Sequence, residues 1–250
     1  MSEVGVAKAR LPLLSLTLLG LWAGVFIALG SLMFTLVASD ASLGFAASRM
    51  LGGLVFSLGM VLVTVAGAEL FTGNNLIVMA WASGRVSSAE LLRNWVVACA
   101  ANFLGAAGLA LLVWLAARES MNGGAVGRTV IGIASAKAQL SPATAFFSGV
   151  LCNVLVCMAV WLAQAGHSVT DKVLGVVFPI AAFVAAGFEH SIANVWLFAY
   201  AALLGAPLGW GDALRNLVPV VAGNIVGGSL LVALVYWVIY LRTPATGEPR

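Results

Sequence analysis

Two long apolar stretches of this chain are each interrupted by a polar phrase: Gly67-Ala68-Glu69-Leu70-Phe71-Thr72-Gly73-Asn74 in the first and, 120 residues later, Gly187-Phe188-Glu189-His190-Ser191-Ile192-Ala193-Asn194 in the second. Glycine, glutamate and asparagine occupy the same three positions in both copies. Carboxylates and amides are rare inside apolar segments, and where they occur they usually serve a function. The duplicated phrase therefore indicates a functional site.

The composition predicts that most of the chain faces lipid. Of the 250 residues, 62% are hydrophobic and only 8% are charged, whereas a soluble domain carries about 25% charged residues. A membrane-spanning helix needs about 20 apolar residues. We expect an all-α, multi-pass membrane protein in a lipid bilayer, with six spans at roughly 12–39, 50–82, 93–116, 143–165, 173–205 and 216–241.

The second and fifth spans are too long for one straight crossing, and each contains one copy of the phrase. We expect both helices to be broken there. A broken helix frees backbone N–H and C=O groups, which lipid cannot satisfy. Gly67, Gly73 and Gly187 permit the turns. Each break also directs the positive end of a half-helix inwards, which favours an anion.

The repeat extends beyond the phrase, because several residue groups recur 120 to 125 residues apart. The pairs are Gly24-Val25 with Gly149-Val150, Met50-Leu51-Gly52 with Val173-Leu174-Gly175, Leu92-Arg93-Asn94 with Leu214-Arg215-Asn216, and Asn102-x-x-Gly105 with Asn224-x-x-Gly227. We predict one transmembrane channel domain over 1–250 with halves at about 12–118 and 140–242. Three crossings per half is an odd number, so the halves have inverted topology, with a site near the membrane midplane.

Six crossings place both termini on one side, which the distribution of basic residues predicts to be cytoplasmic. Seven basic residues share the terminal side and five lie opposite. The first group is Lys8, Arg10, Arg85, Arg93, Lys172, Arg242 and Arg250; the second is Arg49, Arg118, Arg128, Lys137 and Arg215.

Other classes of function find little support in the residues. No basic run or basic patch interleaved with aromatic residues exists, so we expect no nucleic-acid partner. The three cysteines lie in apolar segments without metal-ligand spacing, and we expect no metal and no cofactor. A membrane enzyme needs a nucleophile with a base, a metal cluster or a cofactor motif. The chain has none of these, so we expect a transport protein rather than an enzyme.

The two phrases, together with Ala82-Ser83-Gly84-Arg85, Asn216-Leu217-Val218-Pro219 and the closing Tyr236-Trp237-Val238-Ile239-Tyr240-Leu241-Arg242, resemble the formate/nitrite transporter family of bacterial anion channels, in its formate-channel branch. The resemblance covers about Pro12 to Arg242. It implies an aquaporin-like fold of six helices, a homopentamer with one pore in each protomer, and a place in the inner (cytoplasmic) membrane.

The same resemblance implies roles for individual residues. His190 is expected at the centre of the pore, with Asn153 as its polar neighbour, Thr72 across the lumen, Asn194 among the polar lining and Lys137 in the outer vestibule. Hydrophobic constrictions are expected at Phe56, Met60, Val156 and Phe183. Met60 stands where the formate branch usually has leucine.

Two mechanisms remain open from the sequence. A bare anion loses its hydration in a hydrophobic neck at high cost, so a proton passed through His190 could neutralise a weak-acid anion there; histidine titrates near neutral pH. Alternatively, His190 only donates a hydrogen bond. Formate is the favoured substrate, with nitrite and then hydrosulfide as alternatives.

The remaining polar residues of the repeats are expected to support the structure. Glu69, Glu189 and Asn74 should satisfy groups at the helix breaks, with the two glutamates bonding backbone N–H groups and small hydroxyls; the alternative for the glutamates is a proton relay or a cation site. Asn102 and Asn224 should bond across helices or to freed backbone. For Arg93, Arg215, Asn94 and Asn216 we expect interfacial anchoring and loop capping.

Overall fold

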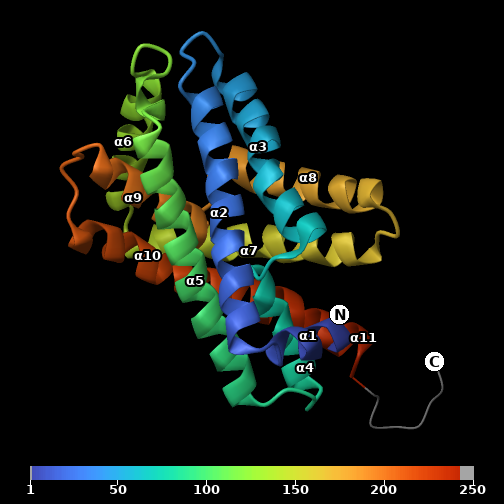
Figure 1. The fold of residues 1–250 in the computed structure, drawn as a ribbon. Helices are drawn as coiled ribbons and strands as arrows, with labels where there is room; N and C mark the ends of the chain where they lie inside the picture. The colour runs from blue at the N-terminus through green and yellow to red at the C-terminus, as the bar shows by residue number, and fades with distance from the viewer. Residues whose placement is uncertain (1, 243–250) are drawn as a thin grey trace.

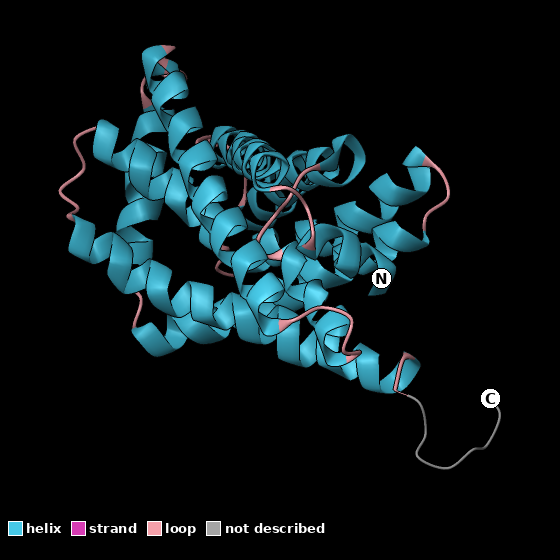
Figure 2. Cartoon of the chain, turned by 60° about the horizontal axis from the view of Figure 1, so that its bottom comes forward, coloured by secondary structure: helices cyan, strands magenta, loops and turns pink. Residues whose placement is uncertain are grey.

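The computed structural model describes residues 2–242; the predicted domain's last residues, 243–250 with Arg250, lie outside the described part, as does residue 1. Throughout residues 2–242 the regular structure is helical, and short loops join the helices (Figure 2). The elements are α1 Ser2–Ala9, α2 Leu13–Ala38, α3 Phe45–Val61, η1 Leu62–Gly67, η2 Gly73–Ile77, α4 Val78–Ala82, α5 Ser88–Leu115, η3 Arg118–Ser120, α6 Ala125–Ala138, α7 Pro142–Ala165, α8 Val169–Ala186, α9 Ser191–Leu203, α10 Trp210–Ile225, η4 Val226–Leu234 and α11 Val235–Tyr240.

Six helical segments of the described chain are long and apolar enough to cross a membrane, which confirms the predicted all-α class and the number of spans. They are Leu13–Ala38, Phe45–Gly67, Ser88–Leu115, Pro142–Ala165, Val169–Ala186 and Trp210–Tyr240. The third and sixth begin earlier than predicted. Ser87 caps α5 and accepts from the Glu90 N–H at 3.2 Å, so the polar residues that seemed to precede the span form its first turns.

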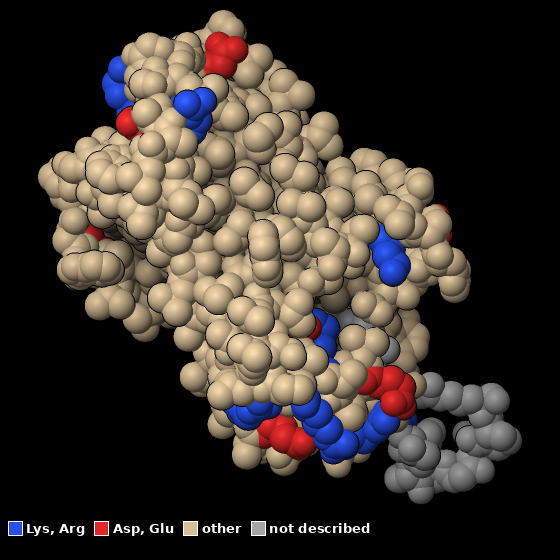
Figure 3. Space-filling view, in the orientation of Figure 1, with Lys and Arg blue, Asp and Glu red and all other residues tan. Residues whose placement is uncertain are grey.

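The surface agrees with a lipid-facing protein. Large apolar side chains are exposed along the spans, with Phe178 exposed by 71% and Leu14 by 71%. Figure 3 shows a broad uncharged band on the visible face, with most of the charged side chains gathered towards its two ends. A soluble protein would not leave such a surface in water.

The helices form two sets that cross one another (Figure 1). In the first half of the chain α2 packs against both α3 and α5, and in the second half α7 packs against both α8 and α10. Contacts between α3 and α8 and between α5 and α9 join the sets. The first and last described helices, α1 and α11, both contact α4, so the two ends of the described chain lie on the same side.

Glycine allows the close approaches within each set. A Cβ added at Gly105 would lie 2.1 Å from the Leu21 carbonyl oxygen, and one at Gly227 would lie 2.2 Å from that of Val150. These distances leave no room for a side chain, so α5 meets α2, and η4 meets α7, backbone against backbone. Small residues at such contacts are typical of helix packing in membranes.

Candidate functional site

Both polar phrases interrupt a helix in the structure. The first helix runs through α3 and η1 to Gly67, and helical structure resumes at Gly73; the second ends at Ala186 and resumes at Ser191. Gly67 has φ +82° and Gly187 has φ +77°. This left-handed conformation is readily adopted only by glycine, which explains why each phrase begins with it.

Asn102, on α5, satisfies the freed backbone of the first break. Its Oδ1 accepts from the Phe71 N–H at 2.8 Å, and its Nδ2 donates to the carbonyls of Glu69 at 2.9 Å and Gly20 at 2.8 Å. The side chain is fully buried. One amide therefore fastens the break to both α2 and α5.

Asn224, on α10, repeats this arrangement at the second break. Its Oδ1 accepts from the Ser191 N–H at 3.1 Å, and its Nδ2 donates to the carbonyls of Glu189 at 3.0 Å and Gly149 at 2.8 Å. The predicted role of the two asparagines at the freed backbone is confirmed. The hydrogen bonds also correct the repeat alignment: Gly149 corresponds to Gly20, not to Gly24.

The glutamate of the first phrase binds a lysine and an asparagine side chain rather than the backbone N–H groups and small hydroxyls we expected. Glu69 is 5% exposed, and its carboxylate accepts from Lys8 Nζ at 2.7 Å and Asn74 Nδ2 at 2.8 Å. Asn74 Nδ2 also donates to Asn94 Oδ1 at 2.9 Å, and Asn94 Nδ2 donates to the Lys8 carbonyl at 3.0 Å. Asn94 is therefore part of a buried network rather than a loop cap.

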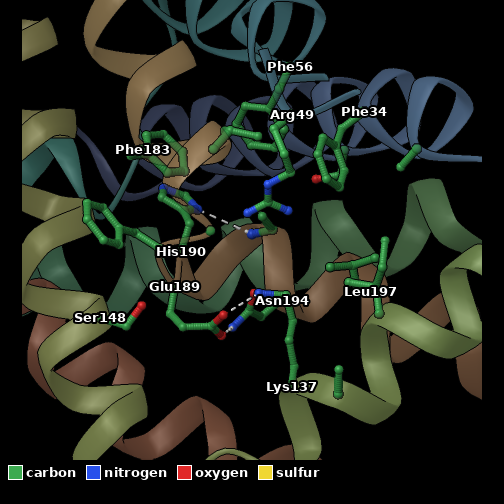
Figure 4. Close-up of a pocket in the computed structure, with 18 of the residues that line it drawn as sticks. Phe34, Arg49, Phe56, Lys137, Ser148, Phe183, Glu189, His190, Asn194 and Leu197 are labelled. Carbon is green, nitrogen blue, oxygen red and sulfur yellow. Dashed lines mark hydrogen bonds and ion pairs between the residues drawn. The ribbon is translucent and has the colours of Figure 1, made fainter. Parts of the chain in front are cut away.

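The second phrase builds the same network from different helices. Glu189, 3% exposed, pairs with Lys137 Nζ at 2.5 Å and accepts from Asn194 Nδ2 at 2.6 Å (Figure 4). Asn194 Nδ2 also donates to Asn216 Oδ1 at 2.9 Å, and Asn216 Nδ2 donates to the Lys137 carbonyl at 3.0 Å. Each carboxylate has a lysine and amide donors, as a buried charge requires.

His190 lies at the centre, where the two breaks meet. It is 2% exposed, and its Nε2 lies 3.1 Å from Thr72 Oγ1 of the other break. Its Nδ1 accepts from the Ala193 N–H at 3.3 Å, so the ring caps α9. A backbone N–H can only donate, so a neutral His190 carries its proton on Nε2, which faces Thr72.

Asn153 supports the centre from behind, and its hydrogen bonds go elsewhere than to His190. Its Nδ2 donates to the carbonyls of Thr72 at 3.2 Å and Asn224 at 2.6 Å and to Asn75 Oδ1 at 2.8 Å. The structure places Asn153 beside the Thr72 backbone, and its role as the polar neighbour of His190 in the pore stays a prediction. Its Oδ1 is buried without a hydrogen-bond partner.

Aromatic and aliphatic side chains surround the Thr72–His190 contact. The Phe56 and Phe183 rings meet edge to face with centroids 5.6 Å apart, and the Phe183 ring stacks on His190 at 5.9 Å. Phe56, Phe183, Met60 and Val156 are each at most 4% exposed. These four predicted constriction residues are all packed in the interior, as a hydrophobic neck requires.

A cavity lies on either side of this neck. The α6-side cavity, about 500 Å³, is lined by Phe56, Phe183, His190, Asn194 and Lys137 among others (Figure 4). The α1-side cavity, about 320 Å³, is lined by Met60, Leu70, Glu69, Asn74 and Lys8 among others. Thr72 and Val156 line neither and lie in the closed layer between them.

Sequence reasoning missed Lys8, the counterpart of Lys137. A signal was present, since Ala7-Lys8-Ala9 returns as Ala136-Lys137-Ala138. It was missed because these residues lie before the spans and 129 residues apart, outside the range of the other pairs. The two halves therefore correspond also in α1, which carries Lys8, and α6, which carries Lys137. Within residues 2–242, no group of three or more His, Cys, Asp or Glu side chains could hold a metal ion.

Comparison with known proteins gives this architecture a family. The family model described as formate/nitrite transporter matches residues 1–238. The chain belongs to the formate/nitrite transporter family. It is 39% identical to "Formate channel FocA" of Escherichia coli (strain K12), with 96% of this chain and 91% of that protein covered. It is 38% identical to "Uncharacterized transporter YrhG" of Bacillus subtilis (strain 168), with 95% of this chain and 90% of that protein covered.

Solved structures of the formate/nitrite transporter family share the fold. A "Pentameric formate channel with formate bound" superimposes with a TM-score of 0.83 at 36% identity, covering 92% of this chain and 98% of that one. An "FNT family ion channel" superimposes with a TM-score of 0.87 at 28% identity, covering 95% of this chain and 96% of that one. The prediction of a transport protein rather than an enzyme is confirmed, because the named relatives are channels or transporters.

Proposed function

We propose that this member of the formate/nitrite transporter family is a channel for small monovalent anions of weak acids, with formate as the main substrate. The observation that carries the proposal is the buried Thr72–His190 contact between two cavities, each lined by charged side chains as well as apolar ones. An anion has one such vestibule on either side and one short apolar layer to cross. The names of the relatives support formate in particular.

The neck supplies one hydrogen-bond donor where the desolvation cost is highest. His190 Nε2–H points at Thr72 Oγ1, and an anion in the neck takes the place of that hydroxyl as acceptor. The Ala193 N–H holds Nδ1 as an acceptor, so the ring is stabilised in its neutral form. The hydrogen bond from Ala193 thus favours donation of a hydrogen bond over donation of a stored proton.

The relatives support the proposed assembly, and the distribution of basic residues supports the proposed orientation. We propose a homopentamer, since the structural neighbour of 36% identity is described as pentameric. The protein resides in the inner (cytoplasmic) membrane, with both termini in the cytoplasm, the side on which the basic residues are in excess. Cross-linking of the purified protein in mild detergent measures the subunit number, and a protease-accessibility assay on membrane vesicles measures the side of the N-terminus.

The decisive experiment is flux through liposomes that contain the purified protein. Formate, nitrite and hydrosulfide are supplied in turn across a series of pH values, and uptake is followed by light scattering. We expect formate to permeate fastest. Equal rates for the three anions would reduce the proposal to a general small-anion channel, and nitrite permeating fastest would contradict the assignment of formate.

Substitution of His190 tests the hydrogen-bond mechanism. A hydrogen bond to a charged group contributes about 1.5–3 kcal/mol, so His190→Leu should lower formate flux roughly 10- to 100-fold. His190→Asn keeps an N–H donor and should lose less. If His190 donates only a hydrogen bond, the pH profile of His190→Asn is parallel to that of the wild type. A profile that loses its pH dependence in the variant would instead identify His190 as a proton donor.

A further inference from the structure

Three ionised side chains line the α6-side cavity: Arg49, Lys137 and Glu189. Lys137 and Glu189 form an ion pair at 2.5 Å, so their opposite charges largely offset each other beyond the immediate surroundings of the pair. Arg49 has no acidic partner in the described chain. Its Nε donates to the Ala185 carbonyl at 2.8 Å, and its guanidinium points into the cavity (Figure 4). The net positive charge of this vestibule therefore resides on Arg49.

The α1-side cavity is likewise lined by two cationic side chains and one carboxylate. Its ionised residues are Lys172, Lys8 and Glu69. Lys8 and Glu69 form an ion pair at 2.7 Å, and Lys172 has no ion pair among residues 2–242. Lys172 is half-buried, as is Arg49. Here the net positive charge resides on Lys172.

The two unpaired cations occupy equivalent positions. Arg49 lies three residues before Gly52 on α3, and Lys172 lies three residues before Gly175 on α8. The two helices pack closely against one another: a Cβ added at Gly53 would lie 2.5 Å from the Ala181 carbonyl oxygen. Each half of the chain thus carries one cation without an ion pair in the described chain. It lies near the start of the helix that precedes the break, and it lines the cavity at one mouth of the neck.

We propose that Arg49 and Lys172 are the residues that collect the permeating anion at the two mouths, and that the lysines paired with Glu69 and Glu189 serve the fold. This inference rests on the proposed anion-channel function. An uncompensated cation in a vestibule with apolar walls raises the local concentration of anions and their rate of encounter. A close ion pair produces only a short-range field, because its two charges offset each other.

The two mouths differ in the chemistry of their cation. Because Nε of Arg49 is engaged with Ala185, its two terminal nitrogens remain for a ligand, and together they match the two oxygens of a carboxylate. Lys172 presents a point charge with no preferred geometry. The α6-side mouth therefore favours formate over a monovalent anion without paired oxygens, such as hydrosulfide, more strongly than the α1-side mouth does.

Ionic strength separates this role from a structural one. Formate flux is measured in liposomes with the wild type, Arg49→Gln, Lys172→Gln and the double variant, at low formate concentration. At an ionic strength of about 10 mM we expect each single variant to lose about two- to fivefold in rate and the double variant to lose more. At about 0.5 M salt the rates should converge, because screening removes the contribution of the charge. Arg49→Lys should retain the salt dependence of the wild type.

Matched controls are Arg128→Gln and Arg242→Gln, which remove the same charge from residues that line neither cavity. Both controls should keep the wild-type rate at low ionic strength. A double variant with wild-type flux at low salt would overturn the inference, and so would a deficit of equal size at both salt concentrations. Absence of formate flux in the wild type would instead contradict the proposed function itself.

Discussion

The two halves of this chain have the same polar scaffold and different central side chains. In the first half, Lys8 pairs with Glu69 while Asn102 binds the break, and in the second half Lys137 pairs with Glu189 while Asn224 does so. These matching residues support the breaks. The halves differ at the central Thr72–His190 contact, so duplication accounts for the scaffold and divergence accounts for this contact.

Two pairs of positions carry the divergence. His190 corresponds to Leu70, and Thr72 corresponds to Ile192, so each half contributes one polar side chain to the central contact. The polar side chains of Thr72 and His190 contact each other, whereas their counterparts Leu70 and Ile192 are apolar and packed in the core with at most 2% exposure. A symmetric centre would contain either two histidines or none.

The largest expected difference between the halves concerns the two buried glutamates. Glu189→Ala leaves Lys137, whose side chain is 16% exposed, without a counter-charge. The loss of one partner of a buried ion pair costs about 3–5 kcal/mol. Glu69→Ala should cost about half as much, because Lys8 is 27% exposed and water can compensate part of its charge. The midpoint of thermal unfolding in mild detergent measures both.

Double variants complete this test. Glu189→Leu with Lys137→Met removes both charges and should recover part of the stability lost in the single variant. Equal destabilisation by Glu69→Ala and Glu189→Ala would break the comparison, because it would mean that the difference in exposure has no energetic consequence.

The asparagines of the breaks should behave alike in the two halves. Asn102→Ala and Asn224→Ala each remove three buried hydrogen bonds to backbone groups. At about 0.6–1 kcal/mol for each bond in a membrane protein, we expect a loss of roughly 2–3 kcal/mol from either substitution. Denaturant unfolding in mixed micelles measures the two values. A difference of more than about 1 kcal/mol between them would show that one break has additional support.

The smallest difference between the halves should come from the glycine contacts. Gly105→Ala and Gly227→Ala place a methyl carbon at 2.1 Å and 2.2 Å from a backbone carbonyl oxygen, so the packed helices must move apart. Overpacking against backbone should cost about 3 kcal/mol or more in both halves. Gly108→Ala is the matched control, since no atom lies within 4 Å of its added Cβ, and it should be neutral or slightly stabilising. Thermal unfolding of the three variants provides the comparison.

Some features of the site were open to prediction and others were not. The breaks and the supporting roles of Asn102 and Asn224 follow from local patterns, whereas the positions of Phe56 and Phe183 were implied by the family resemblance. The pairing of Lys8 with Glu69 was not predicted, because a short helix before the first span has no hydropathy signal and lies 61 residues from its partner. The first helices of the halves were aligned four residues out of register, because glycines recur often in apolar sequence.

The order of apolar and polar residues along the chain was sufficient for the class of protein, the number of spans, the repeat and the family. Hydropathy and motif spacing are local properties of the sequence, and they can be read without knowing which helices pack against each other. The partner of each buried charge was decided only by the tertiary structure. Lys137 is placed beside Glu189, and Arg49 in the same cavity has no acidic partner among residues 2–242, because helices distant in sequence converge there. Which cation keeps an uncompensated charge is therefore a property of the packing.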